Sequence, residues 1–184
     1  MKKLSLILIC LLAGAFLLGC ESKQPTPPDL PVVTPSQDDP NLMICDSAVP
    51  KPDRIVVFDA GSERTIEPDS EEFEDIWLAV HQIANGYESW GAEGFISPAE
   101  LEQKRQLDQV FEFQYDHIYK ASEDSLALYE GIFFEIGELL DFIYLAVDEQ
   151  GNPLEDPDGN VRYSRWYGVY APDLAEDLKM LLFG

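Results

Sequence analysis

The chain has 184 residues, of which 46% are hydrophobic; this excludes a wholly disordered protein and allows one ordinary domain with extensions. It carries 12 Lys and Arg against 35 Asp and Glu, a formal net charge of −23 at pH 7. Such a polyanion repels phosphate backbones, so nucleic acid is not an expected partner. The charge either keeps the protein soluble or attracts a cationic ligand or a basic protein.

The N-terminus has the composition of an export signal. Lys2 and Lys3 precede residues 4–18, a run of 15 residues that is apolar apart from Ser5. A helix that crosses the hydrocarbon core needs roughly 20 residues, whereas this length is typical of the hydrophobic region of a signal peptide. The sequence therefore predicts a signal peptide over residues 1–19.

The apolar run ends in Leu17-Leu18-Gly19-Cys20, which resembles the lipobox of bacterial lipoproteins. The resemblance implies that the Cys20 thiol receives a diacylglyceryl group and that cleavage then falls between Gly19 and Cys20. Two acyl chains anchor a protein stably, whereas one does so only marginally. The implied location is the cell membrane, with the protein lipid-anchored on the extracytoplasmic side. An uncleaved membrane anchor or an ordinary secretory signal are the alternatives.

The segment after Cys20 is rich in proline, which disfavours both helix and sheet. Its prolines are Pro25, Pro27, Pro28, Pro31, Pro35 and Pro40. We therefore expect residues 20–49 to form the lipidated N-terminus and a disordered linker. Residues 21–42, fully extended, would reach on the order of 60–70 Å. Such a segment serves as a stalk through a surface layer or as an unstructured leader.

Residues 50–184 have the patterns of an acidic α+β domain. Strands are predicted at residues 54–60, 109–119, 132–136, 142–147 and 161–170, and helices at residues 67–87, 96–107 and 172–183. The strands follow one another while the helices are set apart from them. We expect a single domain with a mostly antiparallel sheet of about four to five strands and two to three helices.

Local signals define the helix starts and the faces of one strand. Asp69 and Glu72 have the spacing of a capping box, and Ser97 before Pro98 is typical of an N-cap. Alternation in the strand over residues 109–119 predicts one aromatic face and one polar face. The aromatic face holds Phe111, Phe113, Tyr115, His117 and Tyr119, and the polar face holds Glu112, Gln114 and Asp116.

Two acidic segments invite comparison with calcium sites. The first contains Glu67, Asp69, Glu71, Glu72, Glu74 and Asp75. Acids at a helix N-terminus are favoured by the helix dipole, and a metal site needs ligands from several directions. The second, residues 156–160, does not fit the spacing of a calcium-binding loop and indicates a tight turn. We therefore expect no metal ion and no other cofactor.

Catalytic motifs are missing from the sequence. The two histidines, His81 and His117, stand beside no recognisable nucleophile motif, and no zinc-binding spacing is present. The sequence therefore predicts a non-catalytic protein. The alternative is a small envelope hydrolase, with glycans as a candidate substrate, that uses two of the many carboxylates as a pair.

The most unusual local chemistry is a group of arginines and aromatic residues in the last predicted strand. It consists of Arg162, Tyr163, Arg165, Trp166 and Tyr167. This composition is typical of binding hot spots, which makes it a candidate binding patch. Cross-strand aromatic pairs, with the arginines neutralising neighbouring acids, are the favoured explanation. Cys45 is expected to be buried at the edge of the domain. The sequence thus predicts an extracytoplasmic, lipid-anchored envelope protein that binds or scaffolds a partner, an envelope protein or a cationic ligand.

Overall fold

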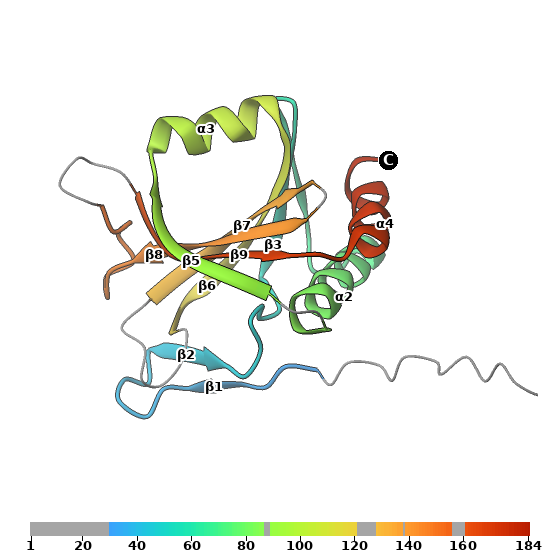
Figure 1. The fold of residues 1–184 in the computed structure, drawn as a ribbon. Coiled ribbons are helices and arrows are strands. Elements are labelled where there is room, and N and C mark those ends of the chain that lie inside the picture. Colours follow the sequence, from blue (N-terminus) through green and yellow to red (C-terminus); the bar gives the residue numbers. More distant parts are fainter. Residues whose placement is uncertain (1–29, 87–88, 121–127, 138, 156–160) are drawn as a thin grey trace, which may run out of the picture.

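The structure is a computed structural model that describes residues 30–86, 89–120, 128–137, 139–155 and 161–184, without the side chains of residues 89–95 and 161–166. These residues form a single α+β domain (Figure 1). Its strands are β1 (Val33–Pro35), β2 (Leu42–Cys45), β3 (Arg54–Asp59), β4 (Ser62–Ile66), β5 (Ser89–Ile96), β6 (Gln109–Lys120), β7 (Leu128–Ile136), β8 (Leu140–Val147) and β9 (Val161–Val169). Its helices are α2 (Glu71–Gly86), α3 (Pro98–Leu107) and α4 (Pro172–Phe183).

The strands form one curled sheet in the order β1-β2-β6-β7-β8-β9-β5. Strand β6 is long enough to pair with two strands along the same edge: its first half pairs with β3 and its end pairs with β2. Strand β4 continues the sheet beyond β3. All of these pairings are antiparallel except β2 with β6. The mostly antiparallel α+β domain is confirmed, but its sheet is larger than the four to five strands predicted.

Helices cover both faces of the sheet. Successive strand residues point to opposite faces. Accordingly, Ile55 and Val57 belong to the main core with α2 and α4, whereas Val56 and Phe58 belong to a smaller cluster with Leu101 of α3. We call the side of the sheet that carries α3 the α3 face. Figure 1 shows α3 apart from α2 and α4, which pack beside each other.

Aromatic side chains dominate the main core. Phe111 of β6 and Phe134 of β7 are register partners, and their rings stack with centroids 4.5 Å apart. Next to them lies the tyrosine cluster, which comprises Tyr115, Tyr119, Tyr129 and Tyr144. The Tyr115 hydroxyl donates to the Pro50 carbonyl at 3.2 Å, and the Tyr144 hydroxyl donates to the Ala48 carbonyl. The segment between β2 and β3 is thereby fixed over the cluster.

Helix α2 begins differently from the prediction. The Ser70 hydroxyl accepts from the Phe73 amide at 3.3 Å and donates to the Glu67 carbonyl at 2.9 Å. Ser70, the residue directly before the helix, therefore caps α2, and the capping box of Asp69 with Glu72 is wrong. The Glu72 carboxylate instead pairs with Arg64 at 2.8 Å.

Helix α3 depends on its N-cap because Leu101 is its one buried residue. The Ser97 hydroxyl accepts from the Glu100 amide at 3.0 Å, as predicted. We expect Ser97→Ala to lower the free energy of unfolding by about 1 kcal/mol, measured by urea denaturation. Ser62→Ala, at an exposed position of β4, is the control and should change it by less than about 0.5 kcal/mol. Equal effects of the two substitutions would contradict the capping role.

The N-terminal part of the domain corrects the predicted linker. Strands β1 and β2 lie within residues 20–49, and the buried Cys45 joins the main core, as expected of that residue. Proline does not prevent this hairpin because β1 is an edge strand, where a missing amide donor breaks no ladder bond to a further strand. Pro35 is the last residue of β1, and Pro40 lies in the connection to β2.

Strands β4 and β5 were not expected from the sequence. The turn between β3 and β4 consists of Ala60 and Gly61, which both have positive φ, at 46° and 88°. Two such residues between register partners Asp59 and Ser62 form the tight hairpin turn that matches the twist of the strands. The sequence of β4, Ser-Glu-Arg-Thr-Ile, is polar because four of its five residues are exposed.

Candidate functional site

Most of the predicted patch on β9 lies outside the described side chains. Strand β9 is an inner strand between β8 and β5, and the side chains of Arg162, Tyr163, Arg165 and Trp166 lie outside the described residues. The Tyr167 ring is half-buried and stacks on Phe142, with centroids 5.0 Å apart. Tyr167 therefore contributes to the packing of the core.

The features predicted nearest the N-terminus also fall outside the described residues. These features are Gly19, Cys20 and the signal peptide. The turn predicted at residues 156–160, near the other end of the chain, also lies outside the described residues. Among the helices that the structure describes, none is both long and apolar enough to cross a membrane.

The acidic start of α2 is an ion-paired helix terminus. Glu72 pairs with Arg64 and Glu74 pairs with Lys51, so two of its acids face cations from the preceding segments. Within the described part of the chain, no three His, Cys, Asp or Glu side chains are grouped so that they could hold a metal ion.

The two histidines occupy different environments. His81 is 3% exposed, and its Nδ1 lies 3.2 Å from the Ser47 hydroxyl and 3.0 Å from the Asn85 amide nitrogen. A catalytic relay needs its nucleophile and its orienting group on opposite ring nitrogens, whereas Ser47 and Asn85 share one. His81 therefore does not form a catalytic relay with Ser47 and Asn85. His117 is exposed and lies within the irregularity in the pairing of β6 with β7, between Gln114 and Tyr119.

A cleft of about 510 Å³ lies between α3 and the α3 face. Register partners on β3, β6, β7 and β8 form rows across this face. The Glu112 row consists of Val56, Glu112, Phe133 and Ile143, and the Gly131 row consists of Arg54, Gln114, Gly131 and Leu145. All four residues of the Gly131 row line the cleft, together with Pro98, Leu101 and Arg105 of α3.

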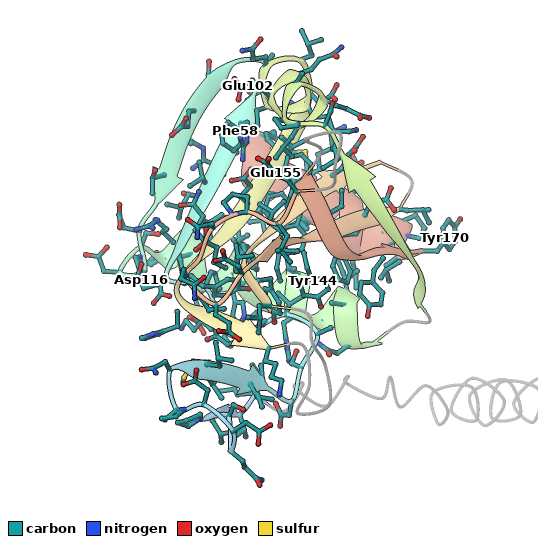
Figure 2. The ribbon with its side chains drawn as sticks, turned by 90° about the vertical axis from the view of Figure 1, so that its left-hand side faces the viewer. Phe58, Glu102, Asp116, Tyr144, Glu155 and Tyr170 are labelled. Atoms are coloured by element: carbon teal, nitrogen blue, oxygen red, sulfur yellow. The ribbon has the colours of Figure 1, made fainter. Side chains whose placement is uncertain are left out.

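A buried ion pair joins α3 to the sheet beside this cleft. Arg105 donates from Nε and Nη2 to the same Glu112 oxygen, at 2.8 and 2.6 Å. The Glu112 side chain is 4% exposed and that of Arg105 is 27% exposed. The guanidinium also lies over the Phe58 ring, 5.5 Å from its centroid. In Figure 2, Phe58 and Glu102 mark this end of the molecule, next to α3.

A chain of polar contacts continues from the ion pair along the sheet. Gln114 donates to the second Glu112 oxygen at 3.4 Å and accepts from Arg54 Nε at 2.8 Å. Arg54 Nη2 lies 3.7 Å from Asp116, which is exposed and is labelled well below α3 in Figure 2. The Gln114 amide is therefore oriented by a carboxylate on one side and a guanidinium on the other.

These contacts decide which chemistry the cleft supports. Glu112 and Glu130 are two carboxylates in its lining, the minimum that a paired-acid hydrolase requires. However, both Glu112 oxygens accept hydrogen bonds from Arg105 and Gln114. These contacts give Glu112 a structural role, because they join α3 to the sheet. The cleft has an apolar side, a polar side and an oriented arginine, the composition of a binding site.

Sequence reasoning placed Glu112 and Gln114 correctly on the face opposite Phe111 and Phe113, but not under a helix. The sequence predicted a polar face without indicating what covers it; in the structure α3 packs against this face and leaves Glu112 3% exposed. The available signal was the pair of cations Lys104 and Arg105 in an otherwise acidic chain. Comparison of the chain with protein-family models, curated proteins and solved structures finds no match.

Proposed function

We propose that the protein is a lipid-anchored, extracytoplasmic module of a bacterial envelope that acts by binding a ligand in the cleft beneath α3. The anchor rests on the resemblance of residues 17–20 to a lipobox, after an apolar run of signal-peptide length. The binding role rests on the cleft, whose polar groups are already oriented by hydrogen bonds before any ligand arrives. Such preorganisation lowers the entropic cost of binding.

The start of the fold limits the length of the tether. Strand β1 begins at Val33, so about a dozen residues separate it from Cys20. At about 3.1 Å per residue, this segment reaches roughly 40 Å when fully extended. The greatest distance between the proposed module and the membrane is therefore shorter than a linker ending at residue 42 would give. Its net negative charge keeps it off an anionic bilayer surface.

Replacement of the lipid-accepting cysteine tests the anchor. We expect Cys20→Ala to remain an unprocessed precursor, because the resemblance implies that cleavage follows lipid attachment. Mass spectrometry should find the mature wild-type chain beginning at a diacylglyceryl Cys20 and the variant chain beginning at Met1. The acyl mass should be lost completely in the variant.

Cys45→Ala is the matched control and should be processed and lipidated like the wild type. Cys45 is buried within the domain and has no part in the tetrad. An unmodified Cys20 in the mature wild-type protein would overturn the anchor and leave the fold and the cleft unaffected.

A further inference from the structure

Two arginines, Arg54 and Arg105, line the cleft, and Arg54 is the more available to a ligand. Its Nε is engaged by Gln114, and its Nη2 lies 3.7 Å from the exposed Asp116. By contrast, Arg105 directs two donors to the buried Glu112 carboxylate. The Arg54 side chain is 47% exposed, so its remaining donors can meet a solute. A guanidinium in a fixed orientation recognises a planar carboxylate by two parallel hydrogen bonds.

The opposite side of the cleft is apolar. Leu101 of α3 and Leu145 of β8 line it, and Gly131 leaves the floor between Gln114 and Leu145 without a side chain. A Cβ at Gly131 would lie 3.4 Å from the Phe113 carbonyl and 3.5 Å from Leu145 Cδ1. Any larger side chain would fill the space between the polar and the apolar halves of the row. The row thus has a cationic end, an open middle and an aliphatic end.

The charge of the lining limits the ligand to one negative group. Glu112 and Glu130 also line the cleft, and Asp116 lies beside Arg54. A dianion such as phosphate would meet this negative potential with a single available arginine. A monocarboxylate matches the one guanidinium. The cleft volume of about 510 Å³ is in the range of small-molecule sites. Neighbouring strands lie about 4.8 Å apart, so the backbones of Arg54 and Leu145 are roughly 14 Å from each other along the row.

We propose that the cleft binds a small aliphatic monocarboxylate, with the carboxylate on Arg54 and the hydrocarbon over Gly131, against Leu101 and Leu145. This inference rests on the proposed binding function and names the class of ligand for the same site. It differs from the cationic ligand that the net charge suggested as one alternative. The local charge of the cleft decides the ligand, because screening weakens the influence of distant acids.

The experiment compares three probes of similar length and different head group: hexanoate, hexanol and hexylamine. Each is titrated into the complete chain in detergent micelles at neutral pH, and amide NMR shifts are followed at Leu101, Gly131 and Leu145. We expect hexanoate to shift these amides with the highest affinity of the three. Arg54→Gln should weaken hexanoate binding about tenfold and leave hexanol binding unchanged.

Arg64→Gln is the matched control. Arg64 is 44% exposed and ion-paired like Arg54, but it lies on β4 away from the cleft. Hexanoate binding should be the same in this variant and in the wild type at equal detergent concentration. If hexanol or hexylamine binds as tightly as hexanoate, the carboxylate inference fails and the binding function stands. If no probe shifts the cleft amides, both fail.

Discussion

Arg105→Met is expected to lower the free energy of unfolding by about 3 kcal/mol, measured by urea denaturation at neutral pH. The substitution keeps most of the side-chain length but removes the charge that faces Glu112. The Glu112 side chain is 4% exposed and lies between Val56 and Phe133 in its row, so it would remain as a buried carboxylate without its counter-ion. Such a charge is far more costly than a broken surface pair.

Lys104→Met is the matched control on the same helix. Lys104 pairs with Glu135 at 2.6 Å, the distance of the closest Arg105 contact, but the Glu135 side chain is 39% exposed. Because water can solvate Glu135, the loss should stay below about 1 kcal/mol. The double variant Arg105→Met with Glu112→Leu should recover most of the stability, because it leaves no buried charge. Equal losses in the two single variants would show that burial of Glu112 does not set the cost.

Unfolding at high pH is the second large expected effect, and it arises in the tyrosine cluster. Burial raises the pKa of Tyr115 and Tyr129 well above the ordinary value of about 10, and raises the pKa of Tyr119 to about 12. Below about pH 10 the three hydroxyls are protonated in both folded and unfolded chains, so their contribution to stability is fully present. Above it the unfolded chain ionises first, and stability falls as pH rises.

The expected slope is about 1.4 kcal/mol per pH unit for each tyrosine, or roughly 4 kcal/mol per pH unit for the three together above pH 10. Urea denaturation between about pH 9 and pH 11 measures the slope, and absorbance of tyrosinate in the ultraviolet shows when the hydroxyls ionise. The buried Cys45 thiol, whose pKa is also raised by desolvation, adds to the loss in the same direction.

Tyr115→Phe separates the titration from the packing. This variant loses the hydrogen bond to the Pro50 carbonyl, which lowers stability by about 1 kcal/mol at all pH values. Its slope above pH 10 should be about a third smaller than that of the wild type, because one titrating hydroxyl is gone. An unchanged slope would mean that Tyr115 ionises equally in the folded and unfolded chains.

The sequence predicted correctly those elements that depend on short-range features, such as a helix N-cap or the alternation of apolar and polar residues in a strand. Ser97 with Pro98 located the start of α3 correctly, and alternation located β6 with Phe111 and Phe113 on the core face. The β1–β2 hairpin was missed because it depends on pairing with β6 from a distant part of the chain. Strand β4 was missed for another reason: four of its five residues are exposed, so it has no apolar alternation, and it forms by pairing with the adjacent β3.

The candidate site could be predicted less well than the fold. Arg54, Glu112 and Gly131 lie far apart in the sequence and meet only because β3, β6 and β7 pair in a particular register. No single segment carries a pattern that reveals the cleft. The covering of the α3 face depends on where a ten-residue helix docks, and that helix has one buried apolar residue to indicate its orientation.

The pairing of β2 with the C-terminal end of β6 determines which end of the domain lies nearest the N-terminal segment. Strand β2 pairs with β6 at Ile118–Lys120, whereas the cleft involves Glu112 and Gln114 near the other end of the same strand. At about 3.3 Å per residue, roughly 20 Å of rigid strand separates Glu112 from the hairpin. In Figure 1, α3 and the β1–β2 hairpin lie at opposite ends of the molecule. A surface that held the chain by its N-terminus would thus face the hairpin, and α3 would lie at the end of the domain farthest from that surface.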